Sequence, residues 1–389
     1  MRVAMFTETF LPSTDGVVTR LLSTLPELAR LGHEVLLLAP DGGPSNYAGT
    51  RVEGFPGKPF FLYPDKRVIW PRTRALDLLR EFRPDLIHTV NPVIFGWGAI
   101  IASRRMHVPL LASYHTHFPH FATVYGYRWA TGLIWTYMRL IHNRATMNLC
   151  TSEAARADLV AHGFRRVRVW DHGIDLGRFR PKPADPAMRA RLAGGRSERT
   201  VLVYVGRLAP EKQIERLLPL VRRDAAVALA IVGDGPCRPQ LERLFAGTAT
   251  TFLGKLHGED LVSAYTSADA LLFPSTMETL GLVLLEAMAC GLPVLAGRSA
   301  PTAALVRDGA GILYDADDPS SLDAAVARLR ADPGLRARLA AASGQLGSAR
   351  GWDGPTRQLV GYYREALQDE GAEAPSGHLA PGDLGAGGY

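Results

Sequence analysis

Short apolar runs alternate with amphipathic stretches along the first part of this 389-residue chain, and this alternation limits the folds that it can adopt. The stretch Val17–Leu31 has a helical pattern that Gly32 ends. Strands that alternate with helices indicate βαβ units and a parallel sheet covered on both faces. The predicted strands are Arg2–Phe6, Glu34–Ala39, Asp85–Thr89, Pro109–Tyr114, Thr146–Thr151 and Val167–Trp170.

The pattern stops at Arg178–Thr200, which is rich in Pro, Gly, Arg and Ala and which we interpret as an interdomain linker with a short helix. It then restarts, with strands expected at Val201–Val205, Ala228–Val232, Thr250–Leu253, Ala270–Phe273 and Pro293–Ala296. Helices are expected at Glu215–Val221, Pro239–Leu244, Gly258–Ser267, Gly281–Ala289, Ser321–Leu329, Leu335–Leu346 and Gly361–Leu367. The sequence therefore predicts an α/β fold of two tandem Rossmann-like, doubly wound parallel-sheet domains that face a central cleft.

The division into domains follows from the same pattern. We assign residues 1–177 to an N-terminal domain and 178–350 to a C-terminal domain. Residues 369–389 are rich in Gly, Pro and Ala with little to bury, so we expect a disordered tail.

Charge and cysteine content exclude several classes of protein. The net charge of +6 fits nucleic acid, an anionic membrane or a phosphate-bearing ligand equally well, but the basic residues are dispersed, so we predict no nucleic-acid partner. Cys150, Cys237 and Cys290 are expected to be buried free thiols. Without a run of about 18 apolar residues or a signal-peptide pattern, we expect a cytoplasmic protein with no spanning helix.

The segment Phe273–Gly297, FPSTMETLGLVLLEAMACGLPVLAG, carries the clearest chemical signal. Glu278 precedes a predicted helix, and Glu286 lies two turns into it among apolar residues, where a carboxylate needs a partner or a ligand. The free amides of Leu280, Gly281 and Leu282 form an anion site at the helix start. The alternative is a helix that merely begins with an acidic residue, which its dipole favours.

Three further loops follow predicted strands. Arg207 and Lys212, in VGRLAPEK, can clamp a diphosphate, or can be part of a solvated basic loop. His115, in YHTH, is a candidate for sugar contact or proton transfer, or a structural histidine. Gly16 opens the first helix and permits close approach of a ligand, although Asp-Gly is also an ordinary turn.

Two patterns argue against cofactors. The first loop lacks G-x-G-x-x-G, which argues against an NAD or FAD enzyme. The acidic run Asp315–Asp318 is interpreted as a solvated loop, and His-x-His alone is a weak metal signal, so we predict no metal site.

Taken together and in this order, the motifs GRLAPEK, VGDGP, Phe273–Gly297 and SYHTH followed by IHNRA resemble glycosyltransferase family 4. The resemblance covers about residues 1–368. Among the members, the chain resembles GDP-mannose-dependent mannosyltransferases and sulfoquinovosyl-diacylglycerol synthases. It implies a retaining, metal-independent GT-B enzyme with a nucleoside-diphosphate sugar as co-substrate. It also implies that the 351–368 helix crosses back to the N-terminal, acceptor-side domain.

The resemblance also implies roles for particular residues. Arg207 and Lys212 would hold the donor diphosphate, which Gly16 would face from the N-terminal domain. Glu278 would contact the sugar hydroxyls, with His115 over the sugar, and Glu286 would bind the ribose. The amides of Leu280, Gly281 and Leu282 would bind phosphates, and Lys255 and Leu256 would lie against the base. The acceptor would attack from the front face. GDP-mannose, UDP-glucose, UDP-galactose and UDP-sulfoquinovose all remain open as donors.

Two segments are candidates for the surface that binds the acceptor. Lys66–Arg83 combines basic residues with an apolar helical stripe, and Phe118–Ile141 is rich in aromatic residues. Both suit a lipid or glycolipid acceptor and peripheral association with an anionic membrane, and both also suit helices packed on a core. The alternatives in other classes are a GT-B nucleotide-sugar epimerase and a non-catalytic nucleotide-sugar-binding protein.

Overall fold

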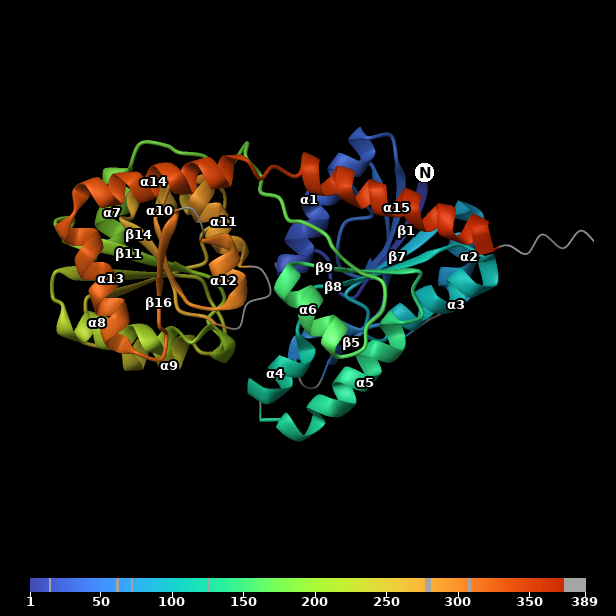
Figure 1. Ribbon diagram of the computed structural model, residues 1–389, viewed down its shortest axis with the longest axis horizontal. Helices are drawn as coiled ribbons and strands as arrows, with labels where there is room; N and C mark the ends of the chain where they lie inside the picture. Colours follow the sequence, from blue (N-terminus) through green and yellow to red (C-terminus); the bar gives the residue numbers. More distant parts are fainter. Residues whose placement is uncertain are drawn as a thin grey trace, which may run out of the picture.

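The computed structural model describes residues 1–389 except 14, 61–62, 71–72, 125, 277–280, 307–308 and 374–389. Figure 1 shows two α/β lobes, one that contains the N-terminus and one that is built from the C-terminal half of the chain. The segment after β10 (Val167–Val169) and the segment that joins α14 (Pro333–Ser348) to the last helix, α15 (Asp353–Glu373), both run between the lobes, and α15 itself lies along the N-terminal lobe. The predicted fold class is confirmed.

The N-terminal sheet has the strand order β10-β9-β8-β7-β1-β2-β4-β3, and its paired strands are parallel except for β3 and β4. The strands are β1 (Arg2–Thr7), β2 (Glu34–Pro40), β3 (Asn46–Tyr47), β4 (Thr50–Phe55), β7 (Leu86–Val90), β8 (Leu110–Tyr114), β9 (Met147–Cys150) and β10 (Val167–Val169); β5 (Lys58–Phe60) pairs separately with β6 (Tyr63–Val68). Its helices are α1 (Gly16–Arg30), α2 (Thr73–Phe82), α3 (Gly96–Met106), α4 (Phe118–Val124), η1 (Arg128–Ala130), α5 (Thr131–His142) and α6 (Glu153–Ala161).

The C-terminal sheet is parallel, with the order β13-β12-β11-β14-β15-β16. Its strands are β11 (Thr200–Val205), β12 (Val227–Val232), β13 (Thr250–Gly254), β14 (Ala270–Phe273), β15 (Val294–Gly297) and β16 (Gly311–Tyr314). Its helices are α7 (Pro186–Leu192), η2 (Pro210–Lys212), η3 (Ile214–Leu217), α8 (Leu218–Arg223), α9 (Arg238–Leu244), α10 (Gly258–Ser267), α11 (Leu282–Ala289), α12 (Ala300–Leu305), α13 (Pro319–Ala331) and α14 (Pro333–Ser348).

Every predicted strand is present within a residue or two, but several elements were not predicted. The strand β4 mixes polar and apolar residues, so no continuous apolar run marks it, and the strand β16 has only four residues. The predicted helix at 215–221 is split into η3 and α8, because Pro219 lies in the first turn of α8 and cannot donate a hydrogen bond to the preceding turn.

The stretch that we interpreted as a linker is partly built into the C-terminal domain. Met188 and Leu192 of α7 pack in the same core as Val201 and Val203 of β11. Ile174, which we assigned to the N-terminal domain, packs in that core as well. The short apolar face of α7 therefore belongs to the second domain rather than to a free linker.

The last helix, α15 (Asp353–Glu373), packs on the N-terminal domain. Leu359, Tyr363 and Ala366 share a core with Leu21 and Leu25 of α1. The disordered tail that we predicted from Asp369 is wrong at its start, because α15 continues through residues 369–373, where Glu and Ala favour a helix. The remainder of that prediction lies outside the described residues.

The stripe of α2 is a core face. Ala75, Leu78, Leu79 and Phe82 are buried and pack against the N-terminal sheet. Of the two alternatives for these apolar positions, this finding supports the helix packed on a core. Cys150 and Cys290 are buried free thiols as predicted, whereas Cys237 is free but partly exposed.

Candidate active site

The loop that carries Arg207 follows β11 and is held by the neighbouring loop after β12. The Tyr204 hydroxyl donates to the Arg207 carbonyl oxygen over 2.9 Å, and the Leu208 amide donates to the Asp234 carbonyl over 3.0 Å. Gly233 has a φ of +141°, and a Cβ placed on it would lie 1.8 Å from the Gly206 carbonyl oxygen. Only glycine lets these two loops approach so closely.

The loop of Lys212 is joined to the loop that leads towards Glu278. The Ser275 hydroxyl donates to the Glu211 carbonyl oxygen over 3.0 Å, and both the amide and the hydroxyl of Thr276 donate to Gln213 Oε1 over 3.2 Å. These loops follow β11 and β14, which are neighbours although β12 and β13 intervene in sequence. This is the topological switch point, where open α/β sheets bind ligands.

Two of the predicted donor-binding residues of this segment, Glu278 and Leu280, lie outside the described residues. Helix α11 begins at Leu282, one residue later than predicted, because Gly281 has a left-handed φ of 75°. A Cβ on Gly281 would lie 2.8 Å from Leu284 Cδ1, so this helix entry requires glycine.

Glu286 lies in α11 with little exposure to solvent. The Tyr265 hydroxyl donates to Glu286 Oε2 over 2.8 Å, and the cation of Arg178 acts on the same carboxyl group. Burial raises the pKa of Glu286 to about 7 against these two lowering effects. The carboxyl group therefore exchanges its proton near neutral pH.

Replacing Glu286 with Gln should change how stability depends on pH. The ordinary pKa of 4.5 applies to the unfolded chain and a pKa of about 7 to the folded protein, so the folded state binds more protons between these values. Stability contributed by this group is therefore lost as the pH rises from about 4.5 to 7 and is constant above that range. We expect the melting temperature of Glu286→Gln, relative to the wild type, to rise across this window and then to level off. Thermal unfolding at several pH values measures it.

The exposed Glu198, changed to Gln, is the control for that measurement. If the melting temperatures of Glu286→Gln and the wild type differed by the same amount at every pH from 4.5 to 8, the raised pKa of Glu286 would be contradicted.

Across from these loops, the start of α1 meets the start of α11. A Cβ on Gly16 would lie 3.3 Å from Leu282 Cδ1, so the two domains come close at this point. The Asp15 side chain accepts hydrogen bonds from the amides of Val17 and Val18 and caps α1. Nearby, α4 lies next to η2, which contains Lys212.

His115 lies at the carboxyl end of β8 in the N-terminal domain. Its Nε2 lies 2.9 Å from the Ser113 hydroxyl, and its Nδ1 lies 3.5 Å from Nη1 of Arg20. Burial, and then the Arg20 cation, lower the pKa of His115 well below its usual value. The ring is therefore neutral at physiological pH and acts through hydrogen bonds rather than charge.

The remaining predicted residues lie at the edge of the C-terminal sheet. Lys255 and Leu256 follow β13, which is two strands away from β11. Lys255 is exposed, whereas Leu256 is partly buried against the domain core. Arg207 and Lys212 thus follow β11, and Leu282 and Glu286 follow the neighbouring strand β14, whereas Lys255 follows the edge strand β13.

Several residues of the site were missed in the sequence. Glu8 follows β1 and accepts hydrogen bonds from the amides of Val93 (2.9 Å) and Gly96 (3.3 Å), and burial raises its pKa to about 7. Asn91, which has a positive φ of 55°, accepts hydrogen bonds from the amides of His115 and Thr116. Glu8 and Asn91 each directly follow a buried strand, and this position in the sequence could have identified them as candidate site residues.

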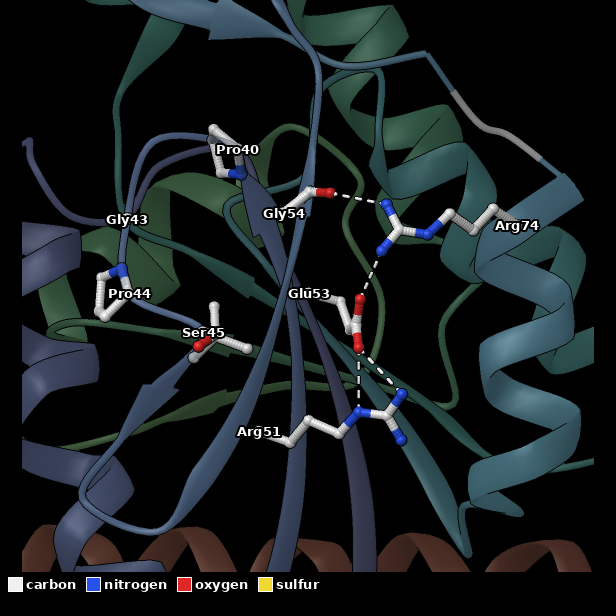
Figure 2. A pocket seen from close by; sticks show the side chains of 9 residues that line it. Pro40, Gly43, Pro44, Ser45, Arg51, Glu53, Gly54 and Arg74 are labelled. Atoms are coloured by element: carbon white, nitrogen blue, oxygen red, sulfur yellow. Dashed lines mark hydrogen bonds and ion pairs between the residues drawn. The ribbon is translucent and has the colours of Figure 1, made fainter.

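A hollow of about 430 Å³ lies beside β2 and β4 of the N-terminal domain. Figure 2 shows that Glu53 lies between the guanidinium groups of Arg51 and Arg74, which both form ion pairs with it. None of the predicted donor-binding residues lines this hollow. It is therefore distinct from the predicted donor site.

The acidic run Asp315–Asp318 lies between β16 and α13 of the C-terminal domain. Asp318 caps α13 by accepting from the Ser320 amide. Within the described ranges, no group of three or more His, Cys, Asp or Glu residues is arranged to hold a metal ion. Metal independence remains an expectation from the sequence.

Comparisons with known proteins agree with this geometry. The family model described as Glycosyltransferase Family 4 matches residues 14–178, and the family model described as Glycosyl transferases group 1 matches residues 192–345. A GDP-mannose-dependent alpha-mannosyltransferase of Mycolicibacterium smegmatis is 36% identical over 375 residues, which is 94% of this chain and 98% of that protein. Sulfoquinovosyl transferase SQD2 of Arabidopsis thaliana is 35% identical over 309 residues, which is 77% of this chain and 60% of that protein.

Anabaena HepE, solved with UDP and glucose, has a TM-score of 0.76 and 21% identity, with 94% of this chain and 100% of that chain covered. The two facing parallel-sheet domains and their loops thus define a glycosyltransferase of the GT-B fold. The chain belongs to glycosyltransferase family 4.

Proposed function

We propose that this protein transfers a hexosyl group, with retention of configuration and without a metal ion, from a nucleoside-diphosphate sugar to a hydroxyl of a membrane lipid or glycolipid. The observation that carries the proposal is the joining of the Arg207–Lys212 loop to the Ser275–Thr276 loop at the switch point. Arg207 and Lys212 follow β11, and the start of α11 follows the neighbouring strand β14, which supports a shared diphosphate site. The relatives named above, which use GDP-mannose or transfer sulfoquinovose, agree with it.

The chemistry follows from the leaving group. The bond between the anomeric carbon and the diphosphate oxygen breaks, and the pair of electrons stays on the diphosphate. Arg207, Lys212 and the first amides of α11 would stabilise this charge, and donors placed in advance where charge develops commonly account for most of an enzyme's rate enhancement. The acceptor oxygen forms the new bond on the same face, and its proton passes to the departing phosphate oxygen.

The donor side can be assigned further. We propose GDP-mannose or a UDP-hexose as the donor, with the ribose on Glu286 and the sugar hydroxyls on Glu278. Glu286 suits ribose because Tyr265 fixes one carboxyl oxygen through its hydroxyl. Full donor affinity in Glu286→Gln would refute the ribose assignment.

A donor panel tests the function. Purified protein is mixed, without metal, with GDP-mannose and UDP-hexoses, with and without a lipid extract, and release of GDP or UDP is followed. Lipid-dependent release supports the proposal and identifies the base. Release of GDP or UDP without lipid points to hydrolysis, isomerisation or a soluble acceptor. If no donor releases GDP or UDP, the result favours a non-catalytic nucleotide-sugar-binding protein.

The acceptor side has an exposed apolar stripe on η1 and α5, here called the α5 stripe. Trp129 is 76% exposed, Leu133 68% and Leu140 46%, and these residues recur at helical spacing. Arg128 and Arg139 are exposed beside them. Figure 1 shows α5 at the lower margin of the N-terminal lobe, away from the C-terminal lobe. We propose that the stripe lies on an anionic membrane, where apolar and basic side chains act together.

Association of this kind is peripheral. In the part of the chain that the structure describes, no helix has both the length and the apolar character needed to cross a bilayer. The aromatic stretch that we considered as a core or membrane element is divided, because Trp135 and Phe118 pack against a small core while Trp129 is exposed.

Replacing Trp129 and Leu133 with Ser should weaken binding to vesicles that contain an anionic lipid. Loss of these two apolar contacts should lower the partition coefficient by about tenfold or more. Co-sedimentation with vesicles measures it, and Val160→Ser, which removes an apolar side chain 50% exposed on α6, is the control. Equal binding by the double variant and the wild type would rule out the α5 stripe as the docking surface.

A further inference from the structure

A chain of buried polar side chains joins His115 to the helix that packs back on the N-terminal domain. His115 Nε2 lies 2.9 Å from Ser113 Oγ, which lies 3.0 Å from His88 Nε2. His88 Nδ1 lies 2.8 Å from the Tyr363 hydroxyl of α15. Ser113, His88 and Tyr363 are fully buried, whereas His115 keeps some exposure at the edge of the site.

The strands bring these side chains to one face of the sheet. Ser113 and His115 are two residues apart, and Val90 pairs with Ser113, which puts His88 on the same face. Helices α1 and α15 cover this face. Trp170 packs between them, with its indole nitrogen donating to the Pro355 carbonyl over 3.1 Å.

Arg20 lies at the His115 end of this row of polar side chains, and its own side chain is 1% exposed. Its guanidinium group stacks 3.6 Å from the Trp170 ring and donates to the carbonyl oxygens of Trp170 and Asp171. These carbonyls belong to the segment that leaves the N-terminal domain after β10. Arg20 is thus fixed by the connector between the domains.

The site of the proton on the neutral His115 ring follows from Arg20. A guanidinium group has no acceptor, so Arg20 donates to His115 Nδ1. A neutral imidazole carries one proton, so His115 holds it on Nε2 and donates to Ser113. The Ser113 oxygen accepts that bond and also lies within hydrogen-bond distance of His88 Nε2, and the Tyr363 hydroxyl lies within hydrogen-bond distance of His88 Nδ1.

We propose that Arg20 is a positioning residue that holds His115 in the Nε2-protonated tautomer, and that Ser113, His88 and Tyr363 hold the same ring from its other side. The position of His115 is thereby coupled to the connector at Trp170–Asp171 and to helix α15, which follows the second crossing between the domains. The consequence for transfer rests on the proposed function, in which His115 lies over the donor sugar.

The first experiment measures the tautomer directly. Long-range 15N–1H correlation spectra of 15N-histidine-labelled protein, recorded without donor, distinguish the two neutral imidazole tautomers. Arg20→Lys keeps a side chain that can only donate, whereas Arg20→Gln offers a carbonyl oxygen that accepts from Nδ1–H. We expect the wild-type tautomer of His115 in Arg20→Lys and a mixture of both tautomers in Arg20→Gln. Identical tautomer populations in these two variants would overturn the proposal.

A second measurement uses a milder change, in case the Arg20 variants fold poorly. Ser113→Ala removes only the hydroxyl between the two rings, and should lower kcat by about tenfold while the donor KM stays within about twofold. Ser343→Ala is the matched control, because Ser343 is also fully buried and donates one bond, to the Leu292 carbonyl in the other domain. An unchanged kcat in Ser113→Ala would contradict the positioning role.

The two experiments fail in distinguishable ways. The tautomer spectrum needs no substrate, so it decides the arrangement of the chain even for a protein that transfers no sugar. Absence of transfer by the wild type with every donor would instead refute the proposed function.

Discussion

Replacing Arg207 with Ala should lower kcat for sugar transfer by about 100- to 1,000-fold, because the departing diphosphate would lose a donor placed where its charge develops. We expect the fold to be preserved, since the hydrogen bond from the Tyr204 hydroxyl to the Arg207 carbonyl does not depend on the side chain that is removed. Initial rates of GDP or UDP release, with the lipid acceptor and the donor varied separately, measure the effect on kcat and KM.

Two further variants sharpen this result. Arg207→Lys keeps the charge but loses the forked geometry, so its kcat should lie between those of the wild type and Arg207→Ala. Arg222→Ala changes an exposed arginine of α8 and should leave kcat unchanged. A kcat for Arg207→Ala within threefold of the wild type would exclude Arg207 from the leaving-group site.

Replacing Gly233 with Ala should lower the free energy of unfolding by about 3 kcal/mol, because the new methyl group combines backbone strain with a clash. Its Cβ would meet the Gly206 carbonyl oxygen at 1.8 Å, and that atom belongs to the loop of Arg207. The loops after β11 and β12 must therefore separate, which should also reduce transfer. Urea denaturation of the variant and the wild type measures the change.

Gly247→Ala separates strain from the clash. Gly247 also has a positive φ, of +77°, but nothing lies within 4 Å of the position of its Cβ. This variant should cost only about 1 kcal/mol. Equal destabilisation by the two changes would show that the contact between the loops contributes nothing.

The predictable parts of the fold are those that local patterns encode. Val201–Val205 and Val227–Val232 are buried on both faces, so their continuous apolar runs were sufficient to mark them as strands. The strand Gly311–Tyr314 was missed although its residues are apolar, and it has only four residues. The sequence left a membrane face and a core face open for α2, because an apolar stripe does not reveal whether protein or lipid covers it.

The candidate site shows the same division. The sequence by itself determined that Arg207, Lys212 and Glu286 stand in loops and helices at strand ends, because their residue types contrast with the apolar runs beside them. It could not determine that Ser275 bonds to the loop of Glu211, or that Tyr265 meets Glu286. Those pairs lie far apart along the chain, and their geometry depends on strand order.

Arg20 and His88 show most clearly what only the tertiary structure decided. In the sequence, Arg20 looks like an ordinary charged residue of an amphipathic helix, and His88 like a polar residue in a strand. Their burial, and their contacts with His115 and Tyr363, come from the packing of α1, β7, β8 and α15 against one another. Strand and helix periodicities are local and can be read along the chain, whereas hydrogen-bond partners are set by which distant segments the fold brings within about 3 Å.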